Sequence, residues 1–525
     1  MAAIVTTNMR VYAANQFISG FSTPGQNLYL FIGRTLPWDQ GAFPYAGSND
    51  NSPPTPIDCE YEEGAAFRDM MSAKLISPST VSLVVPRYDW TTGTVYTQYS
   101  NSIDLFDPSG GLPPFFVITD ALNVYKCLNN HGGVASTVKP TGTTTSVVTS
   151  ADGYQWKYMF TVNSADVLNF VTNEWFPVET LTTNDGSAQW LVQQAAVPGT
   201  IDRIDMVSIG SQYTVTPTIT IVGDGTGATA SPVISGGNIT SIIVTSSGSG
   251  YTWANIVITG GGVGANGAVA TAVISPFAGH GADPVSELGG FFVLIDTKLT
   301  YDENKTFTVN NDYRRVGILK NPLLNDGVTA AVALDYDQMW RLTFGTVSGA
   351  TFLGDETVTG STSGATGVVV DYDSEGLDPV GPGPTLRLAE VVGTFVPGET
   401  VVGSEASGVL LTTTGTATSG TSTTIVLPNS ASAASGAYVG QTILISGGVG
   451  TGQTRIITGY VGTNRTATVN TPWTITPNGT SVYNIASIIA PDLAPYVGEI
   501  VYLENRRPIA RSSDQVEDIK IVVEF

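Results

Sequence analysis

Apolar and polar residues alternate at the C-terminal end of the chain, a pattern typical of a half-buried strand. The apolar face of this expected strand consists of Ile519, Ile521, Val523 and Phe525. A second strand is predicted at residues 499–503, and residues 504–511 predict a turn between the two, because Pro508 cannot donate to a hydrogen-bonded ladder. Strands at the end of a chain need partners formed earlier. The pattern therefore predicts one scaffold made from both ends of the sequence.

The N-terminal half contains stretches with helical spacing and short apolar runs. A helix is predicted to begin at Thr7 or Asn8, and a second helix is predicted over residues 60–75. Strands are predicted at residues 27–32 and 81–85, each followed by Gly or Pro residues that indicate a turn.

Aromatic residues alternate along a further strand that is predicted after the turn at Asp152-Gly153. They are Tyr154, Trp156, Tyr158 and Phe160. A row of exposed rings is one way to bind a sugar. Aromatic ladders more often form the core of a sheet or a subunit interface, and we favour that interpretation.

Two internal repeats follow. Residues 201–214 match residues 239–252 at an offset of 38, and residues 352–361 match residues 395–404 at an offset of 43. Each copy combines a β-like run with a Gly-rich turn, so both repeats predict small β modules.

The repeats divide the chain into a scaffold and inserted modules. The scaffold comprises residues 1–199, 281–344 and 487–525, and the inserted modules are residues 200–280, 345–417 and 418–486. The predicted fold class is mainly β: an antiparallel β-sandwich scaffold with a few short helices, carrying inserted Gly/Thr-rich small β modules.

Composition agrees with a turn-rich β protein, because only 13% of the 525 residues are charged while Gly alone occurs 59 times. The net charge of −22 repels phosphate backbones and anionic lipids, so neither nucleic acid nor a membrane is an expected partner. No apolar run approaches the roughly 18 residues that span a bilayer. We expect a soluble protein made in the cytoplasm, with Cys59 and Cys127 as buried thiols.

The sequence contains few residues or motifs that are typical of catalytic sites. The two histidines, His131 and His280, both lie beside glycine, and neither accompanies a nucleophile elbow or a zinc-binding helix motif. We interpret both as loop residues and predict no catalytic residue, no cofactor and no enzyme activity.

Two further motifs suggest ligand sites. Gly262, Gly264 and Gly267 have the spacing of a dinucleotide fingerprint, but residues 268–274 predict a strand where that fingerprint needs a helix. Residues 371–376 imitate the start of a calcium loop, yet Pro382 occupies the position of the bidentate glutamate. We therefore predict neither a cofactor site nor a metal site.

Three arginines lie close together near the C-terminus of this acidic chain. Arg506, Arg507 and Arg511 are either solvated turn charges or anchors for the carboxylates of a neighbouring subunit. We include them, with Trp38 and Trp90, as candidate interface residues.

Several strings in the scaffold resemble one family. They are IGRTLPW at residues 32–38, VPRYDW at 85–90, DGYQWKYMF at 152–160, NDYRRVGILKNPLL at 311–324, and GEIVYLENRRPI with SSDQVEDIKIVVEF after residue 497. Together they resemble the gene product 8 family, a baseplate wedge subunit of T-even-like contractile-tailed phages. The resemblance covers about residues 1–191, 288–325 and 494–525, whereas the repeats have no obvious counterpart in the T-even form.

The resemblance implies a structural virion protein in the tail baseplate. It implies a homodimer within each wedge, contacts with wedge proteins of the gene product 6, 7 and 10 types, and transmission of the baseplate rearrangement during contraction. The alternative, suggested by the β modules and the aromatic residues, is a host-glycan adhesin or depolymerase.

Overall fold

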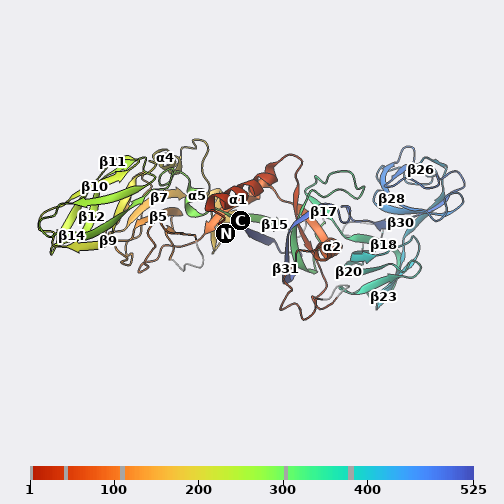
Figure 1. Cartoon of the computed structure of the whole chain (residues 1–525). Coiled ribbons are helices and arrows are strands. Elements are labelled where there is room, and N and C mark those ends of the chain that lie inside the picture. Colours follow the sequence, from red (N-terminus) through yellow and green to blue (C-terminus); the bar gives the residue numbers. More distant parts are fainter. Residues whose placement is uncertain (1–3, 41–44, 107–112, 301–305, 376–382) are drawn as a thin grey trace. The chain divides into compact units, whose positions relative to one another are not determined.

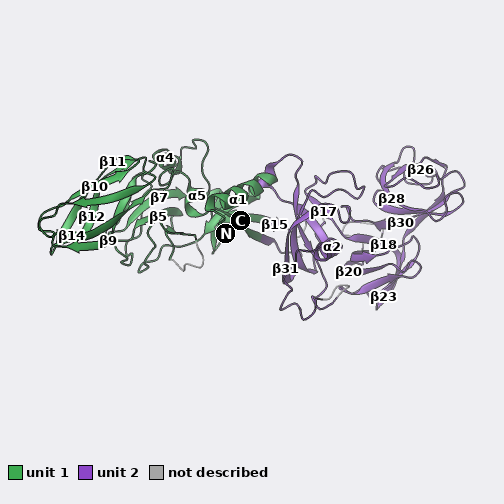
Figure 2. Ribbon diagram, in the orientation of Figure 1, with its two compact units in different colours: residues 1–20, 79–296, 520–525 green, residues 21–78, 297–519 purple. Residues whose placement is uncertain are grey.

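The computed structural model describes residues 4–40, 45–106, 113–300, 306–375 and 383–525. It is mainly β, with antiparallel sheets and short helices, which confirms the predicted fold class at that level. The chain divides into two units: unit 1 contains residues 1–20, 79–296 and 520–525, and unit 2 contains residues 21–78 and 297–519 (Figure 2).

The scaffold sheet of unit 2 is antiparallel and has five strands (Figure 1). Their order is β17 (Asp335–Asp337), β2 (Met70–Leu75), β1 (Leu28–Gly33), β16 (Asp312–Lys320) and β31 (Glu499–Ala510). Strand β1 is buried along its whole length because it lies at the centre of the sheet. The sheet therefore unites segments from both ends of the chain, and β31 forms one edge.

The helix predicted over residues 60–75 is only partly correct. Helix α2 (Glu60–Asp69) ends at Asp69, and Met70–Leu75 forms strand β2. Pairing with β1 overrides the helical spacing of the sequence, because Met70, Met71 and Ala73 become fully buried in the sheet.

Unit 1 contains the end of the chain. One sheet, most of which belongs to unit 1, has the order β32 (Glu517–Glu524), β15 (Phe292–Leu299), β3 (Val81–Pro86) and β8 (Trp175–Pro177). The alternating C-terminal strand is thus confirmed as β32. The first predicted helix is confirmed as α1 (Thr7–Ser22).

A second sheet of unit 1 holds the aromatic stripe. Its order is β4 (Phe116–Ile118), β5 (Asn123–Asn129), β7 (Gln155–Thr161) and β6 (Val148–Thr149). Trp156 is fully buried and stacks on Tyr154 at 5.5 Å between ring centroids. All four rings of the stripe are buried, so they form a core and offer no exposed platform for a sugar. Short helices α3 (Ser164–Phe170), α4 (Ala188–Gln194) and α5 (Pro284–Leu288) complete the unit.

The 38-residue repeat forms a six-stranded sheet in unit 1. The first copy supplies β9 (Ile201–Ser211), β10 (Thr218–Gly223) and β11 (Thr226–Ser235), and the second supplies β12 (Asn238–Ser249), β13 (Ala254–Thr259) and β14 (Asn266–Ile274). Their order is β10-β13-β14-β9-β12-β11, and the end strands β10 and β11 also contact each other, so the sheet is barrel-like. The segment after Gly267 is strand β14, as predicted, and not the helix that a dinucleotide fingerprint requires.

The 43-residue repeat forms part of a larger sheet in unit 2. Its first copy contains β19 (Thr357–Gly360) and its second contains β22 (Thr400–Val402), which pair with each other. The strands of the larger sheet around this pair are β18 (Trp340–Gly349), β20 (Thr366–Asp373), β21 (Thr385–Val392), β23 (Ala406–Leu410) and β24 (Thr412–Thr416). The last module adds β25 (Ser419–Gly420), β26 (Thr424–Val426), β27 (Gln441–Gly447), β28 (Thr454–Val461), β29 (Thr466–Val469) and β30 (Val482–Ile489).

The repeated glutamates lock the two copies of the 43-residue repeat together. Glu356 of the first copy accepts hydrogen bonds from the Ser404 backbone N–H and hydroxyl, both at 2.6 Å. Glu399 of the second copy accepts from the backbone N–H groups of Thr362 (3.0 Å) and Ser363 (2.9 Å), which directly follow the first copy. The exchange is reciprocal, which explains why glutamate recurs at the same place in both copies.

The two cysteines differ. Cys127 is a buried free thiol as predicted, and burial raises its pKa to about 12. Cys59 is exposed, because it immediately precedes α2 at the surface, so the prediction of a buried thiol is wrong there.

Candidate interaction site

The predicted turn at residues 504–511 is instead a bulge inside strand β31. Arg315 pairs with Asn505 and Tyr313 pairs with Ile509, so residues 506–508 stand opposite Arg314 alone. Pro508 fits here because a bulge in an edge strand does not require its missing N–H. A bulge also changes the direction of side chains, and this one carries Arg506 and Arg507.

The side chain of Trp38 holds the backbone of the bulge in place. Its indole Nε1 donates a 2.8 Å hydrogen bond to the Arg506 carbonyl oxygen, and its side chain is fully buried. Two guanidinium groups lie over its ring, Arg34 at 4.4 Å and Arg315 at 5.4 Å from the centroid. Trp38 is therefore a positioning residue inside the scaffold and not a contact residue at the surface.

Arg315 is the centre of a buried ion network. Its guanidinium pairs with Glu62 and Asp69 on α2, at 2.8 Å each, and it also binds Asn505 Oδ1 and the Tyr45 hydroxyl at 2.9 Å. Burial raises the pKa of Asp69 to about 6, and Arg315 opposes that rise. The network ties α2, β16 and β31 together at the bulge.

Arg314 uses the opposite face of β16. It forms a forked pair with Asp50, with both N–O distances at 2.9 Å, and a second pair with Asp312 at 2.6 Å. Both carboxylates are about 30% exposed, in contrast to the buried partners of Arg315.

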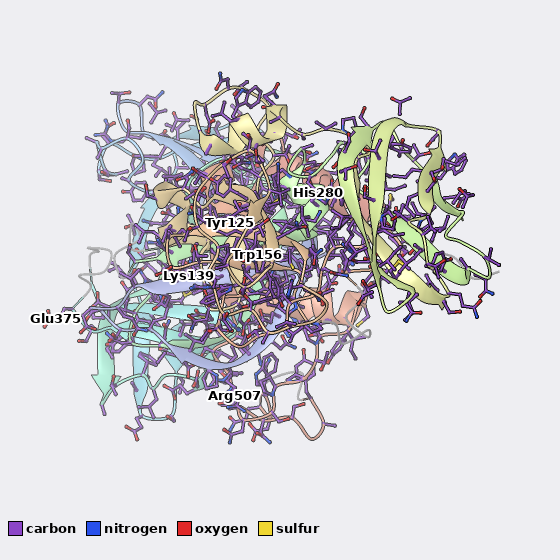
Figure 3. The ribbon with its side chains drawn as sticks, turned by 90° about the vertical axis from the view of Figure 1, so that its left-hand side faces the viewer. Tyr125, Lys139, Trp156, His280, Glu375 and Arg507 are labelled. Atoms are coloured by element: carbon purple, nitrogen blue, oxygen red, sulfur yellow. The ribbon has the colours of Figure 1, made fainter. Side chains whose placement is uncertain are left out.

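The bulge carries two arginines that differ in their ion pairing. Arg506 Nε lies 3.0 Å from Glu504 Oε1, and both side chains are about one-third exposed. Arg507 is exposed and has no ion-pair or hydrogen-bond partner among the described residues (Figure 3). Among the described residues, the bulge therefore carries one arginine without an ion-pair partner, Arg507, and one that is paired, Arg506.

The other predicted interface residues lie elsewhere. Arg511 is fully buried: it pairs with Glu517 at 2.7 Å and donates to the carbonyl oxygens of Thr308 and Thr300. Trp90 belongs to unit 1, packs against the aromatic core and donates to Ser136 Oγ at 3.3 Å. Burial excludes Arg511 from a surface contact, and Trp90 does not belong to this site.

The buried arginines around the bulge are not among the predicted site residues. Arg34, Arg314 and Arg315 lie in or beside strongly apolar strands. Paired arginines inside such a strand are a usable signal, because a charge at a buried position requires a counter-charge. The sequence gives no indication that Glu62 and Asp69 would provide it.

His280 lies in a loop, as predicted, but it is buried and makes specific contacts with carboxylates. Its Nε2 lies 2.7 Å from Asp202 Oδ2 at the start of the 38-residue repeat module, and its Nδ1 lies 3.6 Å from Glu287 Oε2. Lys126 also pairs with Glu287 at 2.8 Å. Burial alone would raise the pKa of Glu287, but Lys126 and His280 hold it at about 2. This cluster anchors the module to the rest of unit 1.

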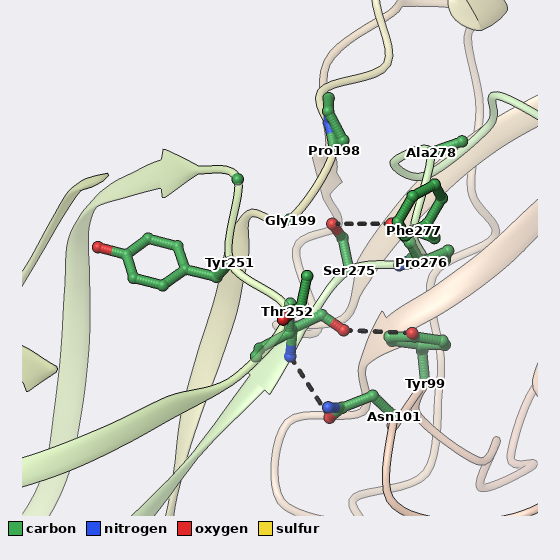
Figure 4. Close-up of a pocket in the computed structure, with 12 residues that line it drawn as sticks. Tyr99, Asn101, Pro198, Gly199, Tyr251, Thr252, Ser275, Pro276, Phe277 and Ala278 are labelled. Carbon is green, nitrogen blue, oxygen red and sulfur yellow. Dashed lines mark hydrogen bonds between the residues drawn. The ribbon is translucent and has the colours of Figure 1, made fainter. Parts of the chain in front are cut away.

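A pocket of about 800 Å³ lies where the 38-residue repeat module joins the rest of unit 1 (Figure 4). The Tyr99 hydroxyl donates to the Ile274 carbonyl oxygen at 3.2 Å, and Asn101 Oδ1 accepts from the Ile274 N–H at 3.4 Å. The ring of Tyr251 points away from these groups (Figure 4).

The remaining histidine and the calcium-like motif, for which the sequence predicts no site, have the following positions. His131 is exposed and has a left-handed backbone, with φ of 51°. Asp371 and Asp373 of the calcium-like motif lie on β20, whereas Gly376 and Pro382 fall outside the described residues. Within the described ranges, no three His, Cys, Asp or Glu side chains gather as metal ligands.

Comparison of the sequence with models of protein families and with curated proteins gives no match. Among the described helices, none is long and apolar enough to cross a membrane.

Proposed function

We propose that this chain is a structural subunit of the baseplate of a contractile phage tail, resembling the gene product 8 wedge protein. The observation that carries the proposal is the convergence of three family-like strings on Trp38. IGRTLPW supplies Trp38 itself, NDYRRVGILK supplies Arg315, and ENRRPI supplies the Arg506 carbonyl oxygen that accepts the indole hydrogen bond. Strings hundreds of residues apart thus resemble one family and build one site.

A mechanical role suits this site. The buried pairs of Arg315 connect one helix to two strands, and breaking any one of them leaves an uncompensated charge, so the scaffold resists local deformation. We propose that it transmits the baseplate rearrangement, assembles as a homodimer in the virion, and contacts wedge proteins of the gene product 6, 7 and 10 types. In this proposal it has no catalytic role and binds no nucleic acid.

Arg507 is the contact residue that the proposal names. Its free guanidinium can form a forked pair with a carboxylate of a partner, while Arg506 contributes less because Glu504 already neutralises it. Exchange of Arg507 for Glu replaces attraction by like-charge repulsion without touching the buried network. For a desolvated contact this costs several kcal/mol.

The test is co-expression of the Arg507→Glu variant with candidate wedge partners, followed by co-purification and size-exclusion chromatography. Lys320→Glu is the matched control: Lys320 lies at the other end of the same strand pair and is bound to Glu499 at 3.0 Å. We expect a folded Arg507 variant that no longer assembles and a Lys320 variant that does. Normal assembly of both variants would refute the role of the bulge, and absence of assembly by the unaltered chain would refute the proposed function.

A further inference from the structure

A pocket of about 350 Å³ lies within unit 2. Its walls come from α2, β18, β21 and the segment at residues 490–496 that precedes β31, with one residue from β28. This volume falls within the range of small-molecule sites.

Three aromatic side chains line the pocket. They are Phe67, Trp340 and Tyr496. The ring centroids of Phe67 and Tyr496 are 5.8 Å apart, and Tyr496 is 58% exposed. An aromatic ring offers a flat, electron-rich face, which complements the face of C–H bonds that a pyranose ring presents.

Two amide side chains supply polar groups of fixed orientation. Asn325 Nδ2 donates to the Pro491 carbonyl oxygen at 2.7 Å, and Gln338 Oε1 accepts from the Leu493 N–H at 2.8 Å. These bonds leave Asn325 Oδ1 as an acceptor and Gln338 Nε2 as a donor, neither with a partner among the described residues. The pocket thus matches a ligand that both donates and accepts hydrogen bonds, as a hydroxyl group does.

The charged residues of the pocket are already engaged. Arg68 and Glu390 line it with opposite signs, and each has an interaction partner of its own. Their charges balance, so the pocket does not select for a charged ligand.

Two residues that line the pocket also have strained backbone conformations. Glu390 and Tyr496, both lining residues, adopt left-handed backbone conformations with φ of 49° and 60°. Non-glycine residues avoid this region, and such conformations cluster at ligand sites, where the surrounding fold enforces them. At Tyr496 the strain holds an exposed ring at the pocket.

From these features together we propose that the pocket binds a neutral pyranose residue of a glycan. The aromatic faces would stack on the sugar ring, and the oriented amides of Asn325 and Gln338 would bind its hydroxyl groups. This binding activity does not depend on the proposed role in a tail.

Saturation-transfer NMR and calorimetry on the full chain test the proposal, with methyl glycosides of glucose, galactose, mannose, N-acetylglucosamine and N-acetylgalactosamine as probes. Glucuronic acid serves as the charged comparison. We expect at least one neutral glycoside to bind and glucuronic acid to bind more weakly. Absence of binding by every neutral probe, or preference for the acid, would overturn the proposal.

Variants separate binding from folding. Tyr496→Gly removes the ring and relieves the left-handed backbone, so binding should fall about tenfold or more while the melting temperature does not fall. Tyr496→Asn, which also tolerates this conformation, should behave alike. Phe277→Ala is the control, because Phe277 is an exposed ring in unit 1 and its loss should leave binding unchanged. Full binding by both Tyr496 variants would place the sugar elsewhere and refute the site.

Discussion

Exchange of Arg315 for Met should destabilise unit 2 strongly. The substitution keeps an apolar side chain of similar length but removes the guanidinium that serves Glu62 and Asp69, both only 3% exposed. It also removes the donors to Asn505 Oδ1 and the Tyr45 hydroxyl. The variant therefore leaves carboxylates in the core without a counter-charge.

The magnitude follows from burial. Breaking a buried ion pair by removal of one partner costs about 3–5 kcal/mol, because the remaining charge stays desolvated. Asp69 can reduce this cost by taking up a proton, since its pKa is already raised to about 6. Glu62, which is only 3% exposed, loses its counter-charge. We therefore expect a loss of about 3–4 kcal/mol at pH 7 and a smaller loss at pH 5.

Urea unfolding followed by tryptophan fluorescence measures this loss, and hydrogen exchange with mass spectrometry assigns it to unit 2. Arg314→Met is the matched control on the adjacent position of β16. Its partners Asp50 and Asp312 are about 30% exposed and regain water when the arginine is removed. The loss should therefore be smaller, about 1–2 kcal/mol, mainly because the Thr35 carbonyl oxygen loses its donor. Equal losses for the two variants, or a loss below about 1 kcal/mol for Arg315→Met, would refute this account.

Two further predictions concern pH and modularity. Burial raises the pKa of Asp69 and Asp337 to about 6, so the protonated forms stabilise unit 2 below about pH 4 and this stability is lost as pH rises through 6. Glu287 in unit 1, with a pKa of about 2, contributes stability above about pH 4.5 that is lost only as pH falls toward 2. Burial also raises the pKa of Asp166 and Glu179 in unit 1, so hydrogen exchange from pH 7 to 4.5 should show a larger rise of protection in unit 2 than in unit 1. Rising protection of unit 2 toward pH 7 would contradict this. Replacement of residues 204–272 by Asn-Gly should close a hairpin between the paired residues on either side. Cooperative thermal unfolding of the remaining unit 1 should persist, and its loss would show that the module is not separable.

The sequence predicts the elements whose cause is local. Strand β32 has a clean period of two, and both repeats are visible as residue identities at a fixed offset. The core placement of Trp156 also follows from its strand, because alternating rings on one face need cover. In these cases the pattern can be read from the sequence without knowledge of which strands pair.

Features that depend on contacts between residues far apart in the chain cannot be predicted from local sequence patterns. Met70–Leu75 has helical spacing but becomes β2 because β1 lies beside it. Pro508 suggests a turn, yet it occupies a bulge because β16 continues past it. The role of Arg315 depends on carboxylates about 250 positions earlier in the chain. No local pattern carries that information.

Both repeats share a geometric property that determines how they can be removed. Ile204 pairs with Ile242 and Thr359 pairs with Val402, and in each case the two residues are equivalents in the repeat, 38 and 43 positions apart. An antiparallel pair of equivalent residues places a local two-fold axis between the copies.

A single copy would therefore expose the edge strand that its twin covers, which is a hazard for aggregation. In the 43-residue repeat it would also leave Glu399, which is only 4% exposed, without the Ser363 backbone N–H and hydroxyl that it binds. Each pair of copies must fold as one cooperative module. Deletion of one copy should thus be more damaging than deletion of both, which is why the proposed excision removes the 38-residue repeat as a pair.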